Sequence, residues 1–269
     1  NLRAVLARLA RRGADAAELG LRTATSLATY WTRQGRLSEA RRWLETFLAA
    51  DRGASTGQRS SALAALGEVV FRQGDYGMAR EHLEACLDLQ RSLDDARGEA
   101  QTLRSLGNIA DEQGDYDGAV AYYERSLAHW SALGDAWGQA AVGNNLGLVA
   151  RKRGDLTEAR RQLEASLAQF RVLGTDWAVG LTQFNLGDVA ADEEDWAKAG
   201  EHYGESLRLA RQLDDLEGVV YALVGLSDVA RMSGKLDAAR ASLEECLPLV
   251  EELGARLHMA EWLEARAAL

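Results

Sequence analysis

One motif recurs along this chain at a fixed spacing of forty residues, and it restricts the possible folds more than any other feature. Each copy opens on a leucine followed by a small residue: Leu66-Gly67, Leu106-Gly107, Leu146-Gly147, Leu186-Gly187 and Leu226-Ser227. A short turn sequence follows at Gly74-Asp75, Gly114-Asp115, Gly154-Asp155, Glu194-Asp195 and Gly234-Lys235. An alanine then returns at Ala79, Ala119, Ala159, Ala199 and Ala239. Self-similarity with a period of about 20–50 residues is typical of a solenoid, whose units cannot bury their apolar faces alone.

The amino-acid composition predicts that the repeated units are helical. Alanine, leucine, arginine and glutamate are abundant, and Pro248 is the only proline. Such a sequence has high helix propensity and few strand or turn residues. Apolar residues make up 47% of the chain and charged residues 27%, which is enough for a continuous core along the repeats. We therefore expect an all-α fold, in which Pro248 kinks or shortens the last of the repeated helices.

Residues 94–133 show how one unit is expected to fold. Apolar and small residues recur three and four positions apart over 98–113, which predicts an amphipathic helix. Gly114 can then supply the left-handed residue that ends this helix, and Asp115 can cap a second helix over about 116–133. Because the turn is short, the two helices should lie antiparallel as an αα-hairpin.

Gly107 lies in the middle of the first of these helices, where a glycine costs about 1 kcal/mol relative to alanine. Since several copies repeat this cost, the position indicates close helix packing, and we expect Ala119 to fit the facing gap. A leucine at Gly107 or Gly147 should overpack the crossing and cost roughly 1–3 kcal/mol. A phosphate-binding role is not indicated, because no strand precedes these glycines and no P-loop sequence follows them.

The repeated positions resemble the signature of the tetratricopeptide family, W-x2-L-G-x2-Y followed by A-x3-F. One copy reads Leu103-x2-Leu106-Gly107-x2-Ala110, then Ala119-x3-Tyr123. The period is forty residues rather than about thirty-four, and the Trp and Tyr positions carry smaller side chains. The resemblance implies a right-handed superhelical α-solenoid of about six helical hairpins plus terminal helices. It also implies that the first helix of each hairpin lines a concave groove.

The repeat spacing divides the chain into segments. Five complete repeats are expected at 54–93, 94–133, 134–173, 174–213 and 214–253. A divergent first repeat is expected at 14–53. Residues 1–13 should form a helix that ends a preceding domain, and residues 254–269 a capping helix or the start of a further repeat.

The N-terminal stretch carries a second resemblance. The sequences Asn1-Leu2-Arg3-Ala4-Val5-Leu6 and Tyr30-Trp31-Thr32-Arg33-Gln34-Gly35 look like the junction found in bacterial STAND-type regulators. In that family a nucleotide-binding core and a winged helix precede a tetratricopeptide-like sensor array, often with LuxR-type or SARP-type DNA-binding ends. The ATPase motifs do not occur in this chain, so the resemblance implies only the sensor module of a cytoplasmic bacterial regulator.

Charge and composition argue against several classes of function. A formal net charge of −10 and a pI near 5.0 do not suit a nucleic-acid-binding surface, and no apolar run approaches membrane-spanning length. The two cysteines, Cys86 and Cys246, occupy the same repeat position and suit free buried thiols in a reducing cytoplasm. We expect no metal, cofactor or enzyme activity, because the four histidines are scattered: His82, His129, His202 and His258.

Positions on the first helices that would face the groove differ between copies, whereas the packing positions do not. Packing explains positions that carry the same residue in every copy, whereas positions that differ between copies are candidates for ligand contact. The candidate ligand-binding residues are Glu68, Arg72, Arg104, Asn108, Asp111, Asn144, Asn145, Leu148, Arg151, Lys152, Phe184, Asn185, Asp188, Tyr221 and Asp228. In the tetratricopeptide family, groove asparagines bind a peptide backbone and basic residues clamp a carboxylate. Arg104, Asn108 and Asn145 lie at such positions, but Leu181 replaces the basic residue that a full clamp needs.

Charge along the expected groove is uneven. A basic patch is expected from Arg104, Arg151 and Lys152. An acidic end is expected from Asp188, Asp192, Glu193, Glu194 and Asp195. The alternative interpretation is that these charges only form solvated helix faces.

Two features depart from the repeat pattern. Glu194 replaces the turn glycine and should carry a left-handed backbone cost of about 1 kcal/mol. Trp137 and Trp177 lie near the turns between repeats, where they are expected to fill the core.

The leading hypothesis from the sequence is a non-enzymatic scaffold that binds a protein or peptide in the groove. Direct nucleic-acid binding and membrane contact are not expected of this segment. Two alternatives stay open. The array could self-associate into a homo-oligomer through its ends, or it could be a sensor of a small-molecule inducer, which needs an enclosed apolar pocket with convergent polar groups.

Overall fold

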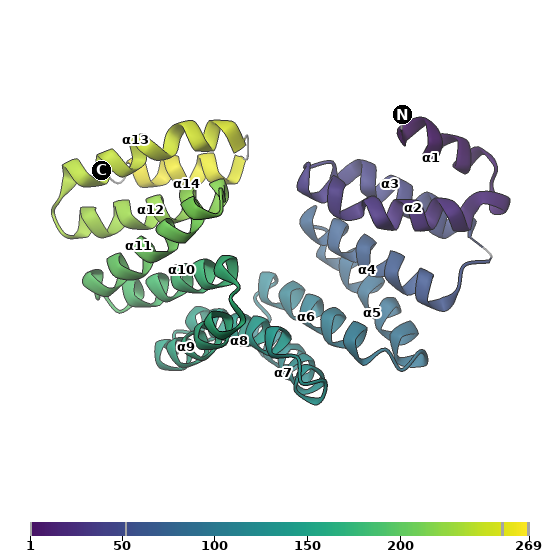
Figure 1. Ribbon diagram of the computed structural model, residues 1–269, viewed down its shortest axis with the longest axis horizontal. Helices are drawn as coiled ribbons and strands as arrows, with labels where there is room; N and C mark the ends of the chain where they lie inside the picture. The colour runs from purple at the N-terminus through teal and green to yellow at the C-terminus, as the bar shows by residue number, and fades with distance from the viewer. Residues whose placement is uncertain (1, 52, 254–255, 268–269) are drawn as a thin grey trace. The chain divides into compact units, whose positions relative to one another are not determined.

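The computed structural model describes residues 2–51, 53–253 and 256–267, and in these residues it contains helices and no strand (Figure 1). The chain divides into two compact units, Asn1–Asp135 and Ala136–Leu269. The helices of unit 1 are α1 Leu2–Arg11, α2 Ala14–Arg33, α3 Leu37–Ala50, α4 Thr56–Arg72, α5 Tyr76–Ser92, α6 Ala96–Glu112 and α7 Tyr116–Ala132. Those of unit 2 are α8 Ala136–Lys152, α9 Leu156–Leu173, α10 Asp176–Asp192, α11 Trp196–Gln212, α12 Leu216–Met232, α13 Leu236–Leu253 and α14 Arg256–Ala267. The predicted all-α solenoid of helical hairpins is confirmed.

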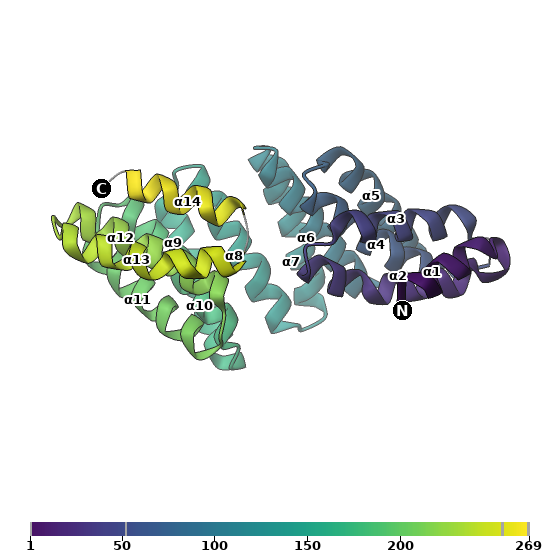
Figure 2. The same cartoon turned by 90° about the horizontal axis from the view of Figure 1, so that it is seen from above.

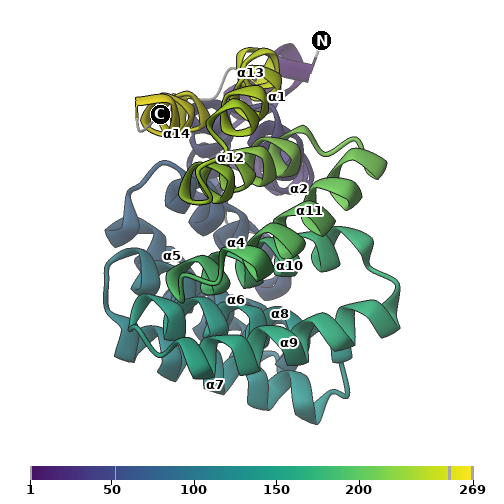
Figure 3. The same ribbon diagram turned by 90° about the vertical axis from the view of Figure 1, so that its left-hand side faces the viewer.

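Consecutive helices pair as antiparallel hairpins, and the pairs follow one another in chain order within each unit. Figure 2 shows this succession for α1 to α7, and Figure 3 shows α8–α9, α10–α11 and α12–α13 stacked in turn. The turn chemistry explains the pairing. Gly114 has a φ of 75°, and the Asp115 carboxylate accepts a hydrogen bond of 3.0 Å from the backbone N–H of Gly118. The chain therefore leaves α6 and enters α7 as its sequence predicts.

The backbone at Glu194 takes the predicted left-handed conformation, with a φ of 61°. Asp94 and Asp214 do the same at the turns between repeats, each with a φ of 53°. Of the two effects expected at Pro248, a kink or a shortened helix, the shortening does not occur. Helix α13 runs through this proline and has 18 residues, as many as α9.

The mid-helix glycines lie where the two helices of a hairpin cross. A Cβ atom on Gly107 would lie 2.5 Å from Cε1 of Tyr123 in α7, and one on Gly147 would lie 2.8 Å from Cγ of Leu163 in α9. The predicted close approach is confirmed, and the side chain directly over Gly107 is that of Tyr123. Tyr123 and Leu163 lie four residues after Ala119 and Ala159 and reach back across the crossing, while both alanines are fully buried.

The first helices of neighbouring hairpins approach one another, whereas the second helices stay apart. Helix α2 contacts α4, and α10 contacts α12. By contrast, no Cα atoms of α9 and α11 come within 8 Å of each other in the part of the chain that the structure describes. We call the exposed surface of α2, α4 and α6 in unit 1, and of α8, α10 and α12 in unit 2, the first-helix face of that unit.

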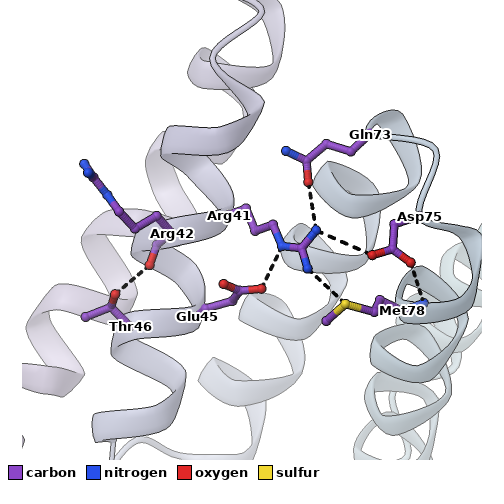
Figure 4. Close-up of polar contacts among 7 residues, drawn as sticks. All are labelled: Arg41, Arg42, Glu45, Thr46, Gln73, Asp75 and Met78. Carbon is purple, nitrogen blue, oxygen red and sulfur yellow. Dashed lines mark hydrogen bonds and ion pairs between the residues drawn. The ribbon is translucent and has the colours of Figure 1, made fainter.

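An arginine on the second helix of one hairpin contacts the turn of the next hairpin (Figure 4). The Arg41 guanidinium, from α3, donates to Glu45 at 2.8 Å on its own helix. It also donates to the Gln73 side chain at 3.2 Å and to the Met78 sulfur at 2.9 Å, and it lies 3.5 Å from the Asp75 carboxylate. Arg80 in α5 repeats the contact with Gln113 at 2.6 Å, and Arg160 in α9 repeats it with Glu193. These contacts fix how successive hairpins stack.

The ends of the array differ from its middle. Helix α1 lies against α2 and buries Leu6. At the other end, Trp262 of α14 is buried, and its indole N–H donates to the Leu243 carbonyl of α13 at 2.8 Å. Of the segments predicted at the two ends, residues 1, 254–255 and 268–269 lie outside the described residues.

Candidate functional site

The first-helix face of unit 1 carries a half-buried cation at Arg104. Arg104 of α6 is half-buried and makes no hydrogen bond or ion pair among the described residues. Its neighbour one turn away, Asn108, accepts a hydrogen bond of 2.7 Å from the Tyr123 hydroxyl. Asp111 is half-buried on the same helix. The predicted polar positions of α6 therefore include one side chain that holds the hairpin together and one that is available to a ligand.

Glu68 and Arg72 of α4 bind each other on the same face, with 2.6 Å between Arg72 Nε and a carboxylate oxygen. Both line a hollow of about 400 Å³ between α2 and α4, whose other walls include Thr25, Thr29 and Arg33. A salt bridge between exposed side chains four residues apart contributes only a few tenths of a kcal/mol. The pair can therefore open at low cost when another group binds.

In unit 2, two predicted ligand-binding asparagines are used inside the protein. Asn144 of α8 and Asn185 of α10 are 6% and 5% exposed. The Asn144 side-chain oxygen accepts hydrogen bonds from the Asn185 amide at 3.0 Å and from the Thr182 hydroxyl at 3.2 Å. Buried amides of this kind hold adjacent hairpins in register, because leaving either unpaired would cost about 1–3 kcal/mol. The structure thus favours the structural interpretation for this pair.

A charged network crosses the same face. Arg151 of α8 donates to the Asp188 carboxylate at 2.5 Å and to the Asp192 carboxylate at 2.5 Å, both on α10. The Tyr203 hydroxyl of α11 donates to the other Asp188 oxygen at 2.7 Å. Burial raises the pKa of Asp188 above its ordinary value, although the Arg151 charge and the Tyr203 hydroxyl oppose this rise. Burial and the adjacent Asp188 charge raise the pKa of Tyr203.

This network corrects the prediction that Arg151 belongs to a basic patch separate from an acidic end. The acidic residues of α10 lie within hydrogen-bonding distance of Arg151 and neutralise it. Sequence spacing could not show this, because the partners lie about forty positions apart and meet only when neighbouring hairpins stack. Of the remaining candidates on α8, Lys152 is exposed, while Asn145 and Leu148 are half-buried. On α12, Asp228 binds Arg231 at 3.2 Å.

Phe184 and Tyr221 line a pocket between α10 and α12 that is floored by the C-terminal half of α11. Their ring centroids lie 5.8 Å apart, and Phe184 also packs against Tyr203 at 5.4 Å. The pocket measures about 220 Å³. Its lining residues are Asp176, Trp177, Gly180, Leu181, Phe184, Ser206, Leu209, Ala210, Leu213, Asp215, Glu217, Gly218 and Tyr221. We call it the α10–α12 pocket.

The expectation that Trp137 and Trp177 fill the core is wrong. Their side chains are 42% and 57% exposed, because both residues lie in the first turn of a helix, at the edge of the repeat rather than inside the hairpin. Sequence reasoning also missed Gly180. This glycine stands where the other copies have Ser60, Ala100, Ala140 and Val220, so a smaller residue beside an exposed tryptophan was a signal that could have indicated the pocket.

Two histidines and one cysteine outside these sites lie partly or fully buried. Burial lowers the pKa of both His82 and His202, and the His202 Nδ1 pairs with the Gln183 side-chain oxygen at 2.6 Å. The buried Cys86 thiol donates to the Ser60 carbonyl at 3.3 Å. Within the described residues no cluster of three or more metal-binding side chains occurs, and no helix there has the length and apolarity to cross a membrane.

Comparison with protein families gives a match over more than half of the chain. A family model described as tetratricopeptide repeat matches residues 58–132 and 179–252. A second model of the same description matches residues 21–49 and 140–168. Comparison with curated proteins finds no match.

Solved structures share the fold at low sequence identity. A Rap protein complexed with competence and sporulation factor aligns with a TM-score of 0.75 and 12% identity, over 92% of this chain and 68% of its own. The apo form of the quorum sensor NprR from B. thuringiensis aligns with a TM-score of 0.68 and 14% identity, over 90% and 67%. A STAND protein with a tetratricopeptide repeat sensor from Pyrococcus horikoshii aligns with a TM-score of 0.68 and 15% identity, over 88% of this chain and 37% of that protein.

Proposed function

This chain belongs to the tetratricopeptide repeat family, and we propose that it is a non-enzymatic scaffold that binds a protein or peptide along its first-helix faces. The observation that carries the proposal is the contrast between the two kinds of repeated position. Glycines such as Gly107 and Gly147 recur under a side chain of the partner helix, whereas the face positions of α6, α8 and α10 differ in charge and size. Packing therefore explains the constant positions and leaves the variable ones available for recognition.

The half-buried Arg104 supports this proposal most directly among the charged side chains. It lies on the first-helix face with no partner among the described residues, next to an asparagine that is already bound to Tyr123. A guanidinium held in this way can donate two hydrogen bonds to a carboxylate or to backbone carbonyls of a ligand. The corresponding positions of other copies, Asn144 and Phe184, are engaged in quite different contacts.

We also propose that the scaffold is the partner-sensing module of a cytoplasmic bacterial regulator. The resemblance of residues 1–6 and 30–35 to the junction of STAND-type regulators supports this assignment. Proteins of the same fold include a Rap protein bound to competence and sporulation factor, a quorum sensor, and the tetratricopeptide repeat sensor of a STAND protein. In such a module, ligand binding would change the stability of the sensor and thereby its contacts with the rest of the protein.

Selection from a random peptide-display library, followed by hydrogen exchange on the complex, tests the scaffold function. Enriched peptides should protect amides in α4, α6, α8, α10 and α12 more than amides in the second helices. Charge reversal by Arg104→Glu should weaken the enriched peptides that contact unit 1 by about tenfold, equivalent to about 1.4 kcal/mol.

Arg125→Glu is the matched control, because Arg125 is an exposed arginine on the second helix α7 of the same unit. It should leave peptide affinity unchanged, and both variants should keep the melting temperature of the original chain. Failure to enrich any peptide, or protection confined to second helices, would contradict the proposed scaffold.

A further inference from the structure

We infer that the α10–α12 pocket is an anchor site for one large apolar side chain of a peptide that carries basic residues beside that side chain. This inference rests on the proposed scaffold function and specifies the chemistry of the ligand. The pocket was not among the features expected from the sequence, and every residue that lines it belongs to unit 2.

The size and the lining of the pocket identify the part of a ligand that fits. At about 220 Å³ it is smaller than the roughly 300–1,000 Å³ typical of small-molecule sites. A single leucine, phenylalanine or tryptophan side chain suits this volume. The wall is formed by the rings of Trp177, Phe184 and Tyr221 and by the leucines of α10 and α11. Anchor side chains at protein interfaces occupy apolar pockets of this kind.

The space arises at Gly180. A Cβ atom at this position would lie 3.4 Å from the Leu209 Cβ, which is ordinary contact, so packing against α11 does not require a glycine here. At Gly187, about two helical turns further along α10, a Cβ atom would lie 2.6 Å from the Tyr203 ring, and packing does require a glycine. The missing side chain at Gly180 therefore opens the pocket without serving the crossing of α10 and α11.

Exposed apolar surface around the mouth supports the same conclusion. Trp177, Leu213 and Leu181 all line the pocket and are still 57%, 43% and 41% exposed. Large apolar side chains that gather at one place on a surface indicate an interaction site. An apolar side chain inserted between them would cover the surface that the protein leaves in water.

The charges at the rim indicate what flanks the inserted side chain. Asp176, Asp215 and Glu217 line the pocket, and the described residues of its lining include no lysine or arginine. Asp215 caps α12 by accepting from the Gly218 N–H at 3.1 Å. The nearby Arg208 interacts electrostatically with Asp176, but its guanidinium already binds Glu205 at 2.7 and 2.6 Å. The negative potential at the rim therefore favours lysine or arginine in the ligand.

A second copy of this chain is a less suitable occupant, because two copies that each carry a formal net charge of −10 repel each other. A basic peptide instead gains from the charge at the rim.

Parallel selections from one random peptide-display library test the inference, using the full chain and its variants. Gly180→Leu places a side chain in the pocket. Gly204→Leu is the matched control, because a Cβ atom at this α11 glycine meets nothing within 4 Å. Peptides enriched on the original chain and on the control should share an aromatic or leucine residue next to lysine or arginine. Peptides selected on Gly180→Leu, in which the pocket is filled, should lack this motif.

Fluorescence anisotropy with one enriched peptide measures the size of the effect. We expect Gly180→Leu to weaken binding by at least about tenfold, as for removal of an interface anchor. Glu217→Lys at the exposed rim should weaken it by about threefold and more strongly at low salt. Trp177→Ala removes one wall and should also weaken binding, so the test remains decisive if Gly180→Leu does not fold.

The outcomes separate this inference from the proposed scaffold function. Enrichment on none of the proteins contradicts the scaffold function itself. Peptides that bind Gly180→Leu as well as the original chain, yet respond to Arg104→Glu, support the scaffold and overturn the pocket. An enriched motif with acidic flanks overturns the inference. So does a dimer, seen by sedimentation, that dissociates in Gly180→Leu, since the pocket would then bind a second copy.

Discussion

At the scale of single residues, the same amino acid serves opposite purposes at different positions of one helix. Gly187 in α10 makes room for the Tyr203 ring, and Gly180 in the same helix leaves an open pocket. In a helix interior each glycine costs about 1 kcal/mol relative to alanine. The gain that offsets this cost is hairpin packing at Gly187 and, on our proposal, ligand binding at Gly180.

We predict opposite effects for the two matched substitutions Gly107→Ala and Gly180→Ala. The first places a Cβ atom 2.5 Å from the Tyr123 ring, so it should lower the free energy of unfolding by about 1–3 kcal/mol. The second makes only ordinary contact with Leu209, so it should raise that free energy by up to about 1 kcal/mol through helix propensity. Urea unfolding followed by circular dichroism measures both. A loss of stability in Gly180→Ala would show that this glycine also serves packing.

At the scale of the helices, each hairpin is linked to the next by contacts that a single hairpin cannot make. Asn144 and Asn185 meet between α8 and α10, Arg151 binds the carboxylates of α10, and Arg41 connects α3 with the turn between α4 and α5. The alternation of helices and turns is encoded locally by caps such as Asp115. Stacking of the hairpins depends on side chains about forty positions apart.

We predict a small but measurable role for the arginine contact at the turn. Arg41→Ala should lower the free energy of unfolding by about 0.5–1 kcal/mol, because the ion pairs of Arg41 are partly exposed and screened by solvent. Arg240 occupies the corresponding position of α13, where its contact with Asp237 is 3.9 Å long and exposed. Arg240→Ala should therefore change stability by less than about 0.5 kcal/mol. Equal effects in thermal unfolding experiments would rule out a stacking role for Arg41.

At the scale of the whole molecule, stability is distributed over many local interactions. In a repeat array each unit contacts only its neighbours, so the free energy of folding is approximately a sum over hairpins and their interfaces. The two compact units have buried clusters of their own, around Leu44, Leu66 and Leu103 in unit 1 and around Leu163 and Leu186 in unit 2.

We predict that residues 1–135 and 136–269 each fold when they are expressed separately. Both fragments should show helical circular dichroism and a cooperative thermal transition, since each keeps its hairpins complete. A fragment of residues 1–113 is the control, because it leaves α6 without α7 and removes Tyr123 from Gly107. That fragment should melt at a lower temperature than residues 1–135. Unfolded spectra from either complete unit would contradict the prediction.

The sequence by itself determined the helices, their turns and the places where they cross. Turn residues such as Gly114 and Asp115 determine the conformation of the adjacent backbone. Gly107 packs under a side chain about sixteen positions away in the same hairpin. Because these interactions are local, the repeated pattern is enough to identify them. Family membership follows from the same repeated positions. The repeat pattern did not show that the Tyr123 ring covers Gly107, because that contact depends on side-chain direction along α7.

The tertiary structure alone decided which side chains on the first-helix face are already occupied and where that face is hollow. Arg151 is neutralised by α10, Asn144 and Asn185 bind each other, and Arg104 has no partner in the part of the chain that the structure describes. The α10–α12 pocket exists because three helices surround the gap that Gly180 leaves. Interactions between stacked hairpins depend on distances and directions in space, and sequence spacing contains neither.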